Sequence, residues 1–280
     1  SVNGAGVLFL PKAGQKTVCI IAGAATAALV GIVILGGIQR IGKASEIIVP
    51  FMAIGYIAIC IIVLSRFGSR ILPAFRDIFS GALGIKQAVG GAAGFGAARA
   101  LRIGMARGVY SNEAGVGSAP MAHACANTND PVKQGMYGIF EVFADTIVMC
   151  TMTALVVLAS GIPLQAGGEI SGTSIALRAF STVLPERTTG IFLAVSMLLF
   201  AYTSLLGWAV YGMQCAKYLF GKRAQLPFCI LYTVLTFAGA LMKVDFVWTA
   251  GETLNYLMAA PNMLALLVLN REVRRETAFA

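Results

Sequence analysis

Long apolar runs, separated by short polar segments, dominate the pattern of this chain. A membrane-spanning helix needs roughly 20 apolar residues, and five runs are long enough to cross a bilayer: Thr17–Gly37, Ile47–Leu64, Gly135–Ser160, Thr189–Tyr211 and Phe246–Leu269. A shorter apolar run, Pro227–Met242, carries no charged residue and predicts a sixth span. The pattern therefore predicts an all-α integral membrane protein.

One apolar segment, Ile71–Ala126, differs from the others because glycines and charged residues interrupt it. Unpaired backbone groups are costly in hydrocarbon, so a broken helix is stable only where it lines a cavity or packs against protein. We expect a seventh, discontinuous span within this segment. Its stretch Gly90–Gly96 is a second place where the helix could unwind, but close helix packing through small residues is the favoured explanation there.

The composition agrees with a protein that faces lipid. Hydrophobic types make up 58% and charged types 12% of the 280 residues, whereas soluble domains carry about a quarter charged residues. The net charge is +9, but the basic residues cluster between apolar runs, as in the cytoplasmic loops of membrane proteins. We therefore expect the lipid bilayer as a partner, no nucleic acid, and a single transmembrane domain over residues 1–280.

The basic loop with Arg40 and Lys43 is assigned to the cytoplasmic side by the distribution of lysine and arginine. Alternation of the spans then places the loop Gly161–Arg187 outside. This loop contains an amphipathic stretch, Ser174–Val183, that is suited to lie along the membrane surface. The first residues of the chain do not resemble a signal peptide, and we expect the chain to begin inside a longer protein.

The densest polar cluster is the run Arg107–Pro120. Ser111 or Asn112 is placed to cap a helix start, and Glu113 would complement the positive end of that helix dipole. Transporters place half-helix ends and open backbone at the sites that bind zwitterionic substrates. The run therefore predicts a binding site or gate; the alternative is a cytoplasmic loop that Arg107 and Glu113 hold in shape.

The fourth apolar run carries hydroxyl groups beside aromatic residues. Thr203 and Ser204, with the Phe200 carbonyl one turn earlier, are spaced to direct oxygens to one point. Hard cations prefer oxygen ligands, so a Na⁺ site is chemically reasonable here. Trp208 lies one turn beyond Ser204 and would wall a small pocket. The alternative is that both hydroxyls bond back to carbonyls of their own helix.

Two acids, Glu141 and Asp145, lie four residues apart in the third apolar run. Acids within a span usually mark an ion path or an internal pair, and Arg107 is a candidate partner. His123 is expected to be a loop or interface residue. The sequence lacks a nucleophile–base pair and the common catalytic motifs, so a membrane-embedded enzyme that uses these residues is disfavoured.

The run RGVYSNEAGVGSAP at Arg107–Pro120 resembles the alanine or glycine:cation symporter family. The resemblance continues through Pro131–Gly135, Asp145-Thr146 and Gly207-Trp208, and extends over essentially the whole chain. It implies a leucine-transporter-like fold of two inverted repeats, of which about seven transmembrane helices, roughly core helices 4 to 10 with a broken helix 6, would be present. It also implies symport of alanine or glycine coupled to Na⁺, or sometimes H⁺, in a multi-pass protein of the plasma membrane, most simply a bacterial inner membrane.

The resemblance also implies roles for individual residues. Phe200, Thr203 and Ser204 would bind the coupling Na⁺, and no other cofactor is expected. Asn112 and Gly115, together with Ser204 and Trp208, would contact a small neutral amino acid. A gate or internal pair would involve four charged residues: Arg107, Glu113, Glu141 and Asp145.

The chain departs from the family pattern at its beginning. Family members start with further helices, including a broken helix 1 that completes the substrate and sodium sites, and no equivalent segment is evident in this sequence. The alternative function is therefore a truncated, non-transporting remnant or a membrane assembly subunit.

Overall fold

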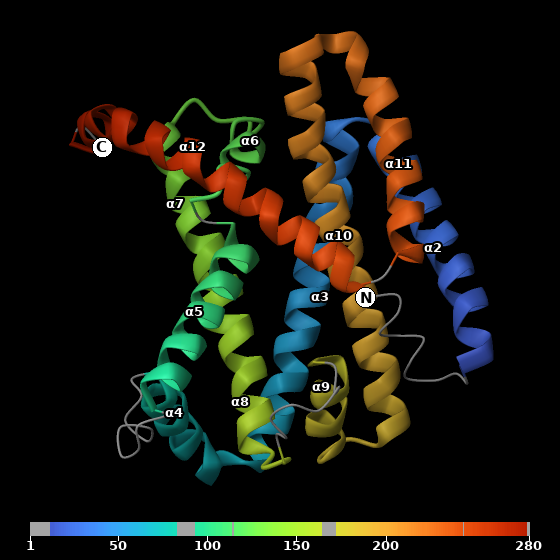
Figure 1. Cartoon of the computed structure of the whole chain (residues 1–280), viewed down its shortest axis with the longest axis vertical. Coiled ribbons are helices and arrows are strands. Elements are labelled where there is room, and N and C mark those ends of the chain that lie inside the picture. The colour runs from blue at the N-terminus through green and yellow to red at the C-terminus, as the bar shows by residue number, and fades with distance from the viewer. Residues whose placement is uncertain (1–11, 83–92, 114, 164–171, 243, 279–280) are drawn as a thin grey trace. The chain divides into compact units, whose positions relative to one another are not determined.

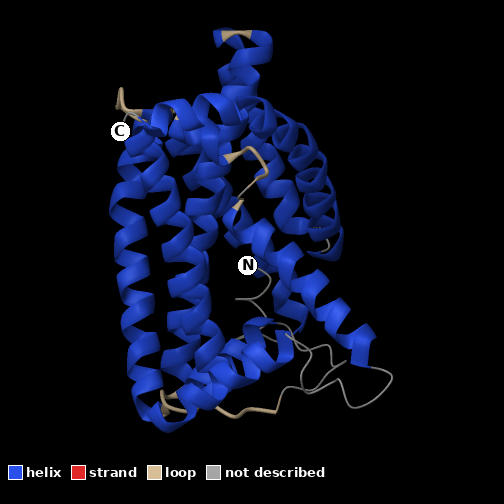
Figure 2. Ribbon diagram, turned by 90° about the vertical axis from the view of Figure 1, so that its left-hand side faces the viewer, coloured by secondary structure: helices blue, strands red, loops and turns tan. Residues whose placement is uncertain are grey.

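Helices joined by loops and turns make up the described part of this computed structural model, which covers residues 12–82, 93–113, 115–163, 172–242 and 244–278 and shows no strand there (Figures 1 and 2). The helices in chain order are α2 (Lys12–Ile34), α3 (Ile38–Arg66), α4 (Gly68–Ala82), α5 (Ala93–Asn112), α6 (Ala119–His123), α7 (Pro131–Val142), the π-helix η1 (Phe143–Cys150), α8 (Thr151–Ala159), α9 (Gly172–Ser181), α10 (Glu186–Phe220), the short 3₁₀-helix η2 (Lys222–Ala224), α11 (Gln225–Leu241) and α12 (Val244–Ala278). The all-α prediction is confirmed for these residues.

Five helical segments are long and apolar enough to cross a membrane: Ile38–Arg66, Pro131–Ala159, Glu186–Phe220, Lys222–Leu241 and Phe246–Ala278. Each contains one of the predicted runs to within one residue. The remaining run, Thr17–Gly37, falls largely on α2, whose described apolar part Cys19–Ile34 is shorter than a span. Large apolar side chains such as Phe51, Ile139 and Leu267 lie exposed on these helices, as expected for surfaces that face lipid.

The span Pro131–Ala159 is not one uniform α-helix. Asp130 caps its start, since the Asp130 carboxylate accepts a hydrogen bond from the Lys133 backbone N–H at 2.9 Å. The middle of the span, Phe143–Cys150, forms the π-helix η1. In a π-helix the backbone hydrogen bonds join residues five positions apart, whereas in an α-helix they join residues four positions apart. The sequence pattern predicted the span but not this change of helix type.

The chain divides into two compact units, each described by itself. Unit 1 comprises Ser1–Tyr56, Gly117–Asn129 and Gly190–Met258. Within it α2 and α11 lie side by side (Figure 1). A Cβ built on Gly23 would lie only 2.7 Å from the Ala240 Cβ, and one on Gly31 would lie 3.1 Å from the Thr233 methyl. The absence of a side chain at these glycines allows the two backbones to approach closely, as in many membrane bundles.

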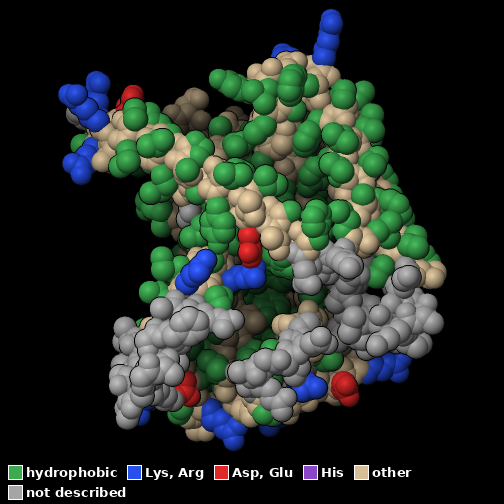
Figure 3. All heavy atoms as spheres, in the orientation of Figure 1, with side chains coloured by type: hydrophobic (Ala, Val, Ile, Leu, Met, Phe, Trp, Pro, Cys, Tyr) green, Lys and Arg blue, Asp and Glu red, His purple; other side chains and the backbone are tan. Residues whose placement is uncertain are grey.

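The core of unit 1 is an apolar cluster from α2, α3, α10 and α11. Leu206 and Ala209 of α10 are fully buried within it, together with Val30 of α2. Hydrophobic side chains also cover much of the visible surface of α10 and α11 (Figure 3). The same helices are therefore apolar on both faces, which is typical of membrane spans.

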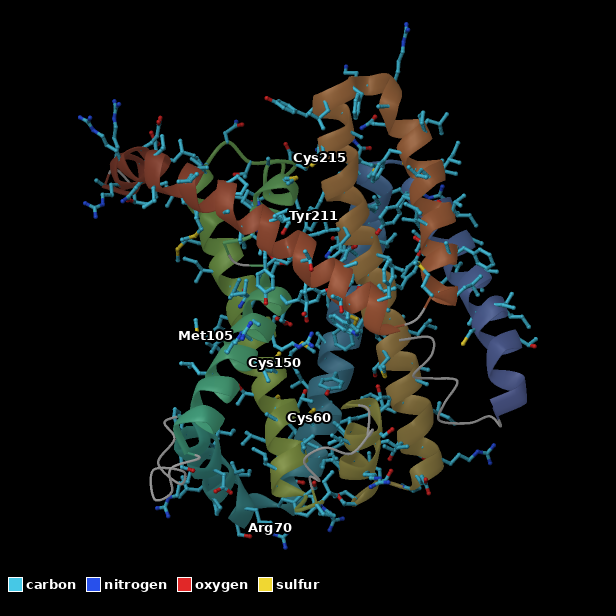
Figure 4. The ribbon with its side chains drawn as sticks, viewed as in Figure 1. Cys60, Arg70, Met105, Cys150, Tyr211 and Cys215 are labelled. Atoms are coloured by element: carbon cyan, nitrogen blue, oxygen red, sulfur yellow. The ribbon has the colours of Figure 1, made fainter. Side chains whose placement is uncertain are left out.

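Unit 2 comprises Ile57–Val116, Asp130–Thr189 and Ala259–Ala280. Here α8 packs against α4 and α9, and α5 packs against α4 and η1. Arg70 of α4, labelled in Figure 4, donates to the Ala159 carbonyl at the end of α8 at 3.4 Å. The predicted amphipathic stretch Ser174–Val183 coincides largely with α9, whose Phe180 is fully buried. Its placement along a membrane surface stays a prediction.

Candidate functional site

A sharp turn interrupts the apolar segment Ile71–Ala126 directly after α5. The Glu113 N–H donates to the Val109 carbonyl at 3.0 Å, and the Val116 N–H donates to the Glu113 carbonyl at 3.1 Å. Both Glu113, at φ 54°, and Gly115, at φ 80°, have left-handed backbone conformations. Glu113 thus ends α5 at the position where glycine is usual. A helix break occurs in the segment for which the sequence predicted it.

The prediction that Ser111 or Asn112 caps a helix start is wrong. Both residues are in the last turn of α5, so they lie at a helix C-terminus. The next helix, α6, begins at Ala119 after Ser118, whose side chain makes no capping hydrogen bond. Glu113 therefore follows the negative end of a helix dipole, where a carboxylate is not stabilised by that dipole. The turn therefore offers backbone groups that lie outside a helix, and not the N–H groups of a helix N-terminus.

A polar contact connects α5 with the π-helix η1 in unit 2. The Ser111 hydroxyl donates to the Asp145 carboxylate at 2.9 Å. Figure 4 labels Met105 of α5 and Cys150 of η1 on these two packed helices. The Thr146 hydroxyl beside Asp145 is buried without a hydrogen-bond partner among the described residues. π-helical turns often occur at functional sites, and this one places polar groups within a span.

The other charged residues of the predicted gate lie on the same unit. Arg107 is exposed on α5, and Glu141 is exposed near the end of α7. Glu113 lies in the turn after α5. The structure therefore brings Asp145 into contact with Ser111, a residue of the same predicted polar cluster. The roles of all four charged residues as a gate or internal pair stay predictions.

The predicted cation residues lie in the middle of α10 in unit 1. The Thr203 hydroxyl donates to the Phe200 carbonyl at 3.1 Å and to the Leu199 carbonyl at 3.0 Å. The Phe200 carbonyl and the Thr203 hydroxyl, two of the three predicted Na⁺ ligands, are thus within hydrogen-bond distance of each other. The bonds also match the alternative expectation that the hydroxyl bonds back to its own helix. A hydroxyl that donates its proton still offers lone pairs, so the two expectations are compatible.

The two remaining α10 residues share one face of the helix. Ser204 and Trp208, one turn apart, are both exposed, and Trp208 keeps 41% of its surface accessible. Leu206 and Ala209, on the opposite face, are fully buried. The helix therefore directs its apolar face into the core of unit 1 and presents the serine and tryptophan on the outer face of that unit.

Aromatic residues that the sequence analysis did not single out support this part of α10. The Tyr56 ring of α3 lies 5.9 Å from the Phe200 ring, edge to face, and 6.0 Å from the Phe192 ring. The Tyr232 hydroxyl of α11 donates to the Leu205 carbonyl at 2.8 Å. These contacts hold the backbone around Thr203 from two neighbouring helices. A tyrosine in the middle of an apolar run is the signal that would have indicated them.

Sulfur-containing side chains join α6 to the later part of α10 within unit 1. Cys215, labelled in Figure 4, lies with its sulfur 3.5 Å from the Met121 sulfur. The Gln214 amide donates to the Cys125 sulfur at 2.6 Å. No group of histidine, cysteine and acidic side chains suited to a metal ion occurs in the part of the chain that the structure describes. The contacts explain how α6, which carries His123, packs.

Asn262 of α12, which the sequence analysis also missed, contacts the turn after α5. Its amide donates to the Gly115 carbonyl at 3.0 Å within unit 2. Asn262 follows Pro261 inside an apolar helix. A proline and an amide side by side in a span are the sequence signal that could have identified this position.

The residues predicted to bind substrate and cation divide between the two units. Asn112 and Gly115 belong to unit 2, whereas Phe200, Thr203, Ser204 and Trp208 belong to unit 1. In unit 2 the predicted residues lie at the end of α5 and in the turn after it. In unit 1 all of them lie on one helix, α10. Of the predicted stretch Gly90–Gly96, residues 90–92 lie outside the described residues, and residues 93–96 form the beginning of α5.

Comparison with known proteins identifies the family of this chain. The sequence profile described as the sodium:alanine symporter family matches residues 10–278. The sodium/alanine symporter AgcS of Methanococcus maripaludis is 40% identical over 261 residues, which cover 92% of this chain and 56% of the relative. An uncharacterized transporter of Haemophilus influenzae is 38% identical, with 89% of this chain and 54% of the relative covered.

A probable sodium/glutamine symporter of Bacillus subtilis, GlnT, is 36% identical over 88% of this chain and 50% of its own length. The chain spans about half the length of the curated relatives it matches. The relatives are transporters and not enzymes, and the apolar helices agree with a multi-pass membrane protein. On the match over residues 10–278, the chain belongs to the sodium:alanine symporter family.

Proposed function

We propose that the complete protein to which this chain belongs carries a small neutral amino acid, alanine or glycine, across the cell membrane together with Na⁺. The observation that carries the proposal is family membership, since relatives of this chain are named as sodium/alanine and probable sodium/glutamine symporters. The energy source would be the inward Na⁺ gradient, with H⁺ as an alternative coupling ion. The chain's part in transport would be to supply polar groups from a broken helix and from α10.

The proposed cation ligands are the Phe200 carbonyl and the hydroxyls of Thr203 and Ser204. Support comes from the 3.1 Å separation between the Phe200 and Thr203 oxygens and from the preference of hard cations for oxygen. The contacts of Tyr56 and Tyr232 on neighbouring residues would keep this backbone fixed. A fixed set of oxygens favours one cation size over others, because the ligands do not collapse onto a smaller ion.

The proposed amino-acid contacts are Asn112 and Gly115 at the helix break, and Ser204 and Trp208 on the exposed face of α10. A zwitterion needs donors for its carboxylate and acceptors for its ammonium, and open backbone supplies both. The indole of Trp208 would restrict the size of the side chain that binds. Arg107, Glu113, Glu141 and Asp145 would form a gate or an internal pair.

The proposed mechanism is alternating access in a leucine-transporter-like fold of inverted repeats. Na⁺ and the amino acid would bind together and change the populations of outward-open and inward-open states. Coupling then requires that each ligand increases the affinity for the other by the same factor. A broken helix in an otherwise apolar segment supports this mechanism, because such breaks line the central sites of many secondary transporters.

The test is uptake of radiolabelled alanine by proteoliposomes that contain the complete gene product. We expect an inward Na⁺ gradient to drive accumulation, and unlabelled alanine or glycine to compete more strongly than glutamine. Equal accumulation with neither a Na⁺ nor a proton gradient would refute the proposal. Absence of any uptake by protein that inserts correctly would instead favour a non-transporting remnant or an assembly subunit.

A further inference from the structure

The turn after α5 has a backbone conformation that is locally unfavourable at Glu113. Glu113 and Gly115 both have positive φ angles, of 54° and 80°, and such angles are unfavourable for residues other than glycine. The turn also lies at the boundary of helix α5, where backbone groups lack helical partners. A contact from outside the turn would offset part of this local cost.

Both ends of the peptide between Gly115 and Val116 are engaged. The Val116 N–H donates to the Glu113 carbonyl at 3.1 Å, inside the turn. The Gly115 carbonyl accepts from the Asn262 amide at 3.0 Å. Val116 itself is only 2% exposed. The plane of this peptide is thus fixed from one side by the turn and from the other by α12.

The contact from α12 is specific in direction. Asn262 is half-buried, and its neighbour Met263 places its sulfur 4.0 Å from where a Gly115 Cβ would be. The Met263 sulfur is thus within ordinary van der Waals distance of that position, and the Asn262 amide is the directional element of the contact. A hydrogen bond to a backbone carbonyl orients the whole peptide unit, because the carbonyl and the following N–H share one rigid plane.

We infer that Asn262 is a positioning residue that sets the orientation of the Glu113–Val116 turn for amino-acid binding. The inference rests on the proposed function, in which Asn112 and Gly115 contact the amino acid. Asn262 acts through the Gly115 carbonyl and does not itself touch the substrate. The Val116 N–H has its partner inside the turn, whereas the Gly115 carbonyl has two lone pairs and can accept a second hydrogen bond from the ammonium group of the substrate.

The experiment compares Asn262→Leu with Asn270→Leu in the complete gene product, reconstituted in lipid. Leucine has nearly the shape of asparagine but no donor, and Asn270 is an exposed asparagine on the same helix, which makes it a matched control. We expect Asn262→Leu to raise the KM for alanine at saturating Na⁺ about fivefold, the effect of one lost hydrogen bond. The maximal rate should change less than the KM.

A second readout does not depend on transport. Hydrogen–deuterium exchange of the peptide that contains Val116 should be about fivefold faster in Asn262→Leu than in the parent, and unchanged in Asn270→Leu. Asn262→Ala should give the same change, which guards against a packing fault specific to leucine. Unchanged exchange, or an unchanged KM in a protein that transports, overturns the inference. If exchange is faster in Asn262→Leu but the parent binds no alanine, the positioning of the turn by Asn262 is retained and the proposed function is refuted.

Discussion

Replacing Thr203 by valine tests the proposed cation site with little other disturbance. Valine keeps the branched shape of threonine and removes one oxygen. The Thr203 hydroxyl donates to the Leu199 and Phe200 carbonyls of its own helix, at 3.0 and 3.1 Å. Such back-bonds contribute little to helix stability and slightly weaken it in some contexts. We therefore expect α10 to remain intact in Thr203→Val.

The effect on the cation is expected to be larger than the effect on the fold. Interactions of a neutral group with a charged partner contribute about 1.5–3 kcal/mol, and each 1.4 kcal/mol corresponds to about tenfold in affinity. Loss of the Thr203 oxygen should therefore raise the half-saturating Na⁺ concentration between about tenfold and a hundredfold. The decrease in alanine uptake should be greatest at low Na⁺ concentration. High Na⁺ concentration should restore uptake, because the remaining oxygen ligands are still present.

The assay is alanine uptake into proteoliposomes at increasing external Na⁺, with Thr236→Val as the control. Thr236 of α11 is a half-buried threonine whose hydroxyl donates to the Tyr232 carbonyl at 2.8 Å, so valine causes the same local change away from the proposed ligands. We expect a normal Na⁺ response in the control. Identical half-saturating Na⁺ concentrations in Thr203→Val and the parent would refute the assignment of Thr203.

Two further predictions concern stability, each read as the thermal unfolding temperature in detergent. Gly23→Val should destabilise unit 1 by about 1–3 kcal/mol, because even a Cβ at this position lies 2.7 Å from the Ala240 Cβ; an unchanged unfolding temperature would contradict the described packing of α2 on α11. Gly115→Ala and Gly55→Ala should have opposite signs. Gly115 has φ 80°, where alanine is strained by about 1 kcal/mol or more, whereas Gly55 lies within helix α3 with open space for a Cβ, where alanine stabilises by roughly 0.5–1 kcal/mol. Equal shifts for the two glycines would exclude the left-handed turn.

The apolar runs could be predicted from the sequence because the bilayer imposes one strong constraint on length and composition. The run Ile47–Leu64 falls inside α3, and Pro227–Met242 largely coincides with α11. Glycine and charged residues also indicated the segment in which α5 ends in a turn, whereas a discontinuous span there stays a prediction. These features depend on local composition, which a single sequence contains.

Features that depend on hydrogen bonding across distance could not be predicted in the same way. Ser111 and Asn112 have the side chains of a helix N-cap, but tertiary structure continues α5 through them, and the backbone of Glu113 ends the helix instead. The π-helix Phe143–Cys150 has no clear sequence signature either. Asn262 and Gly115 are separated by 147 positions, so neither residue alone indicates the contact.

The role of Na⁺ as the coupling ion is tested most directly by alanine binding to the complete gene product at a series of Na⁺ concentrations. The account predicts that Na⁺ lowers the dissociation constant of alanine, and that alanine lowers the dissociation constant of Na⁺ by the same factor. Alanine affinity that does not change between Na⁺-free and Na⁺-saturated conditions would contradict it.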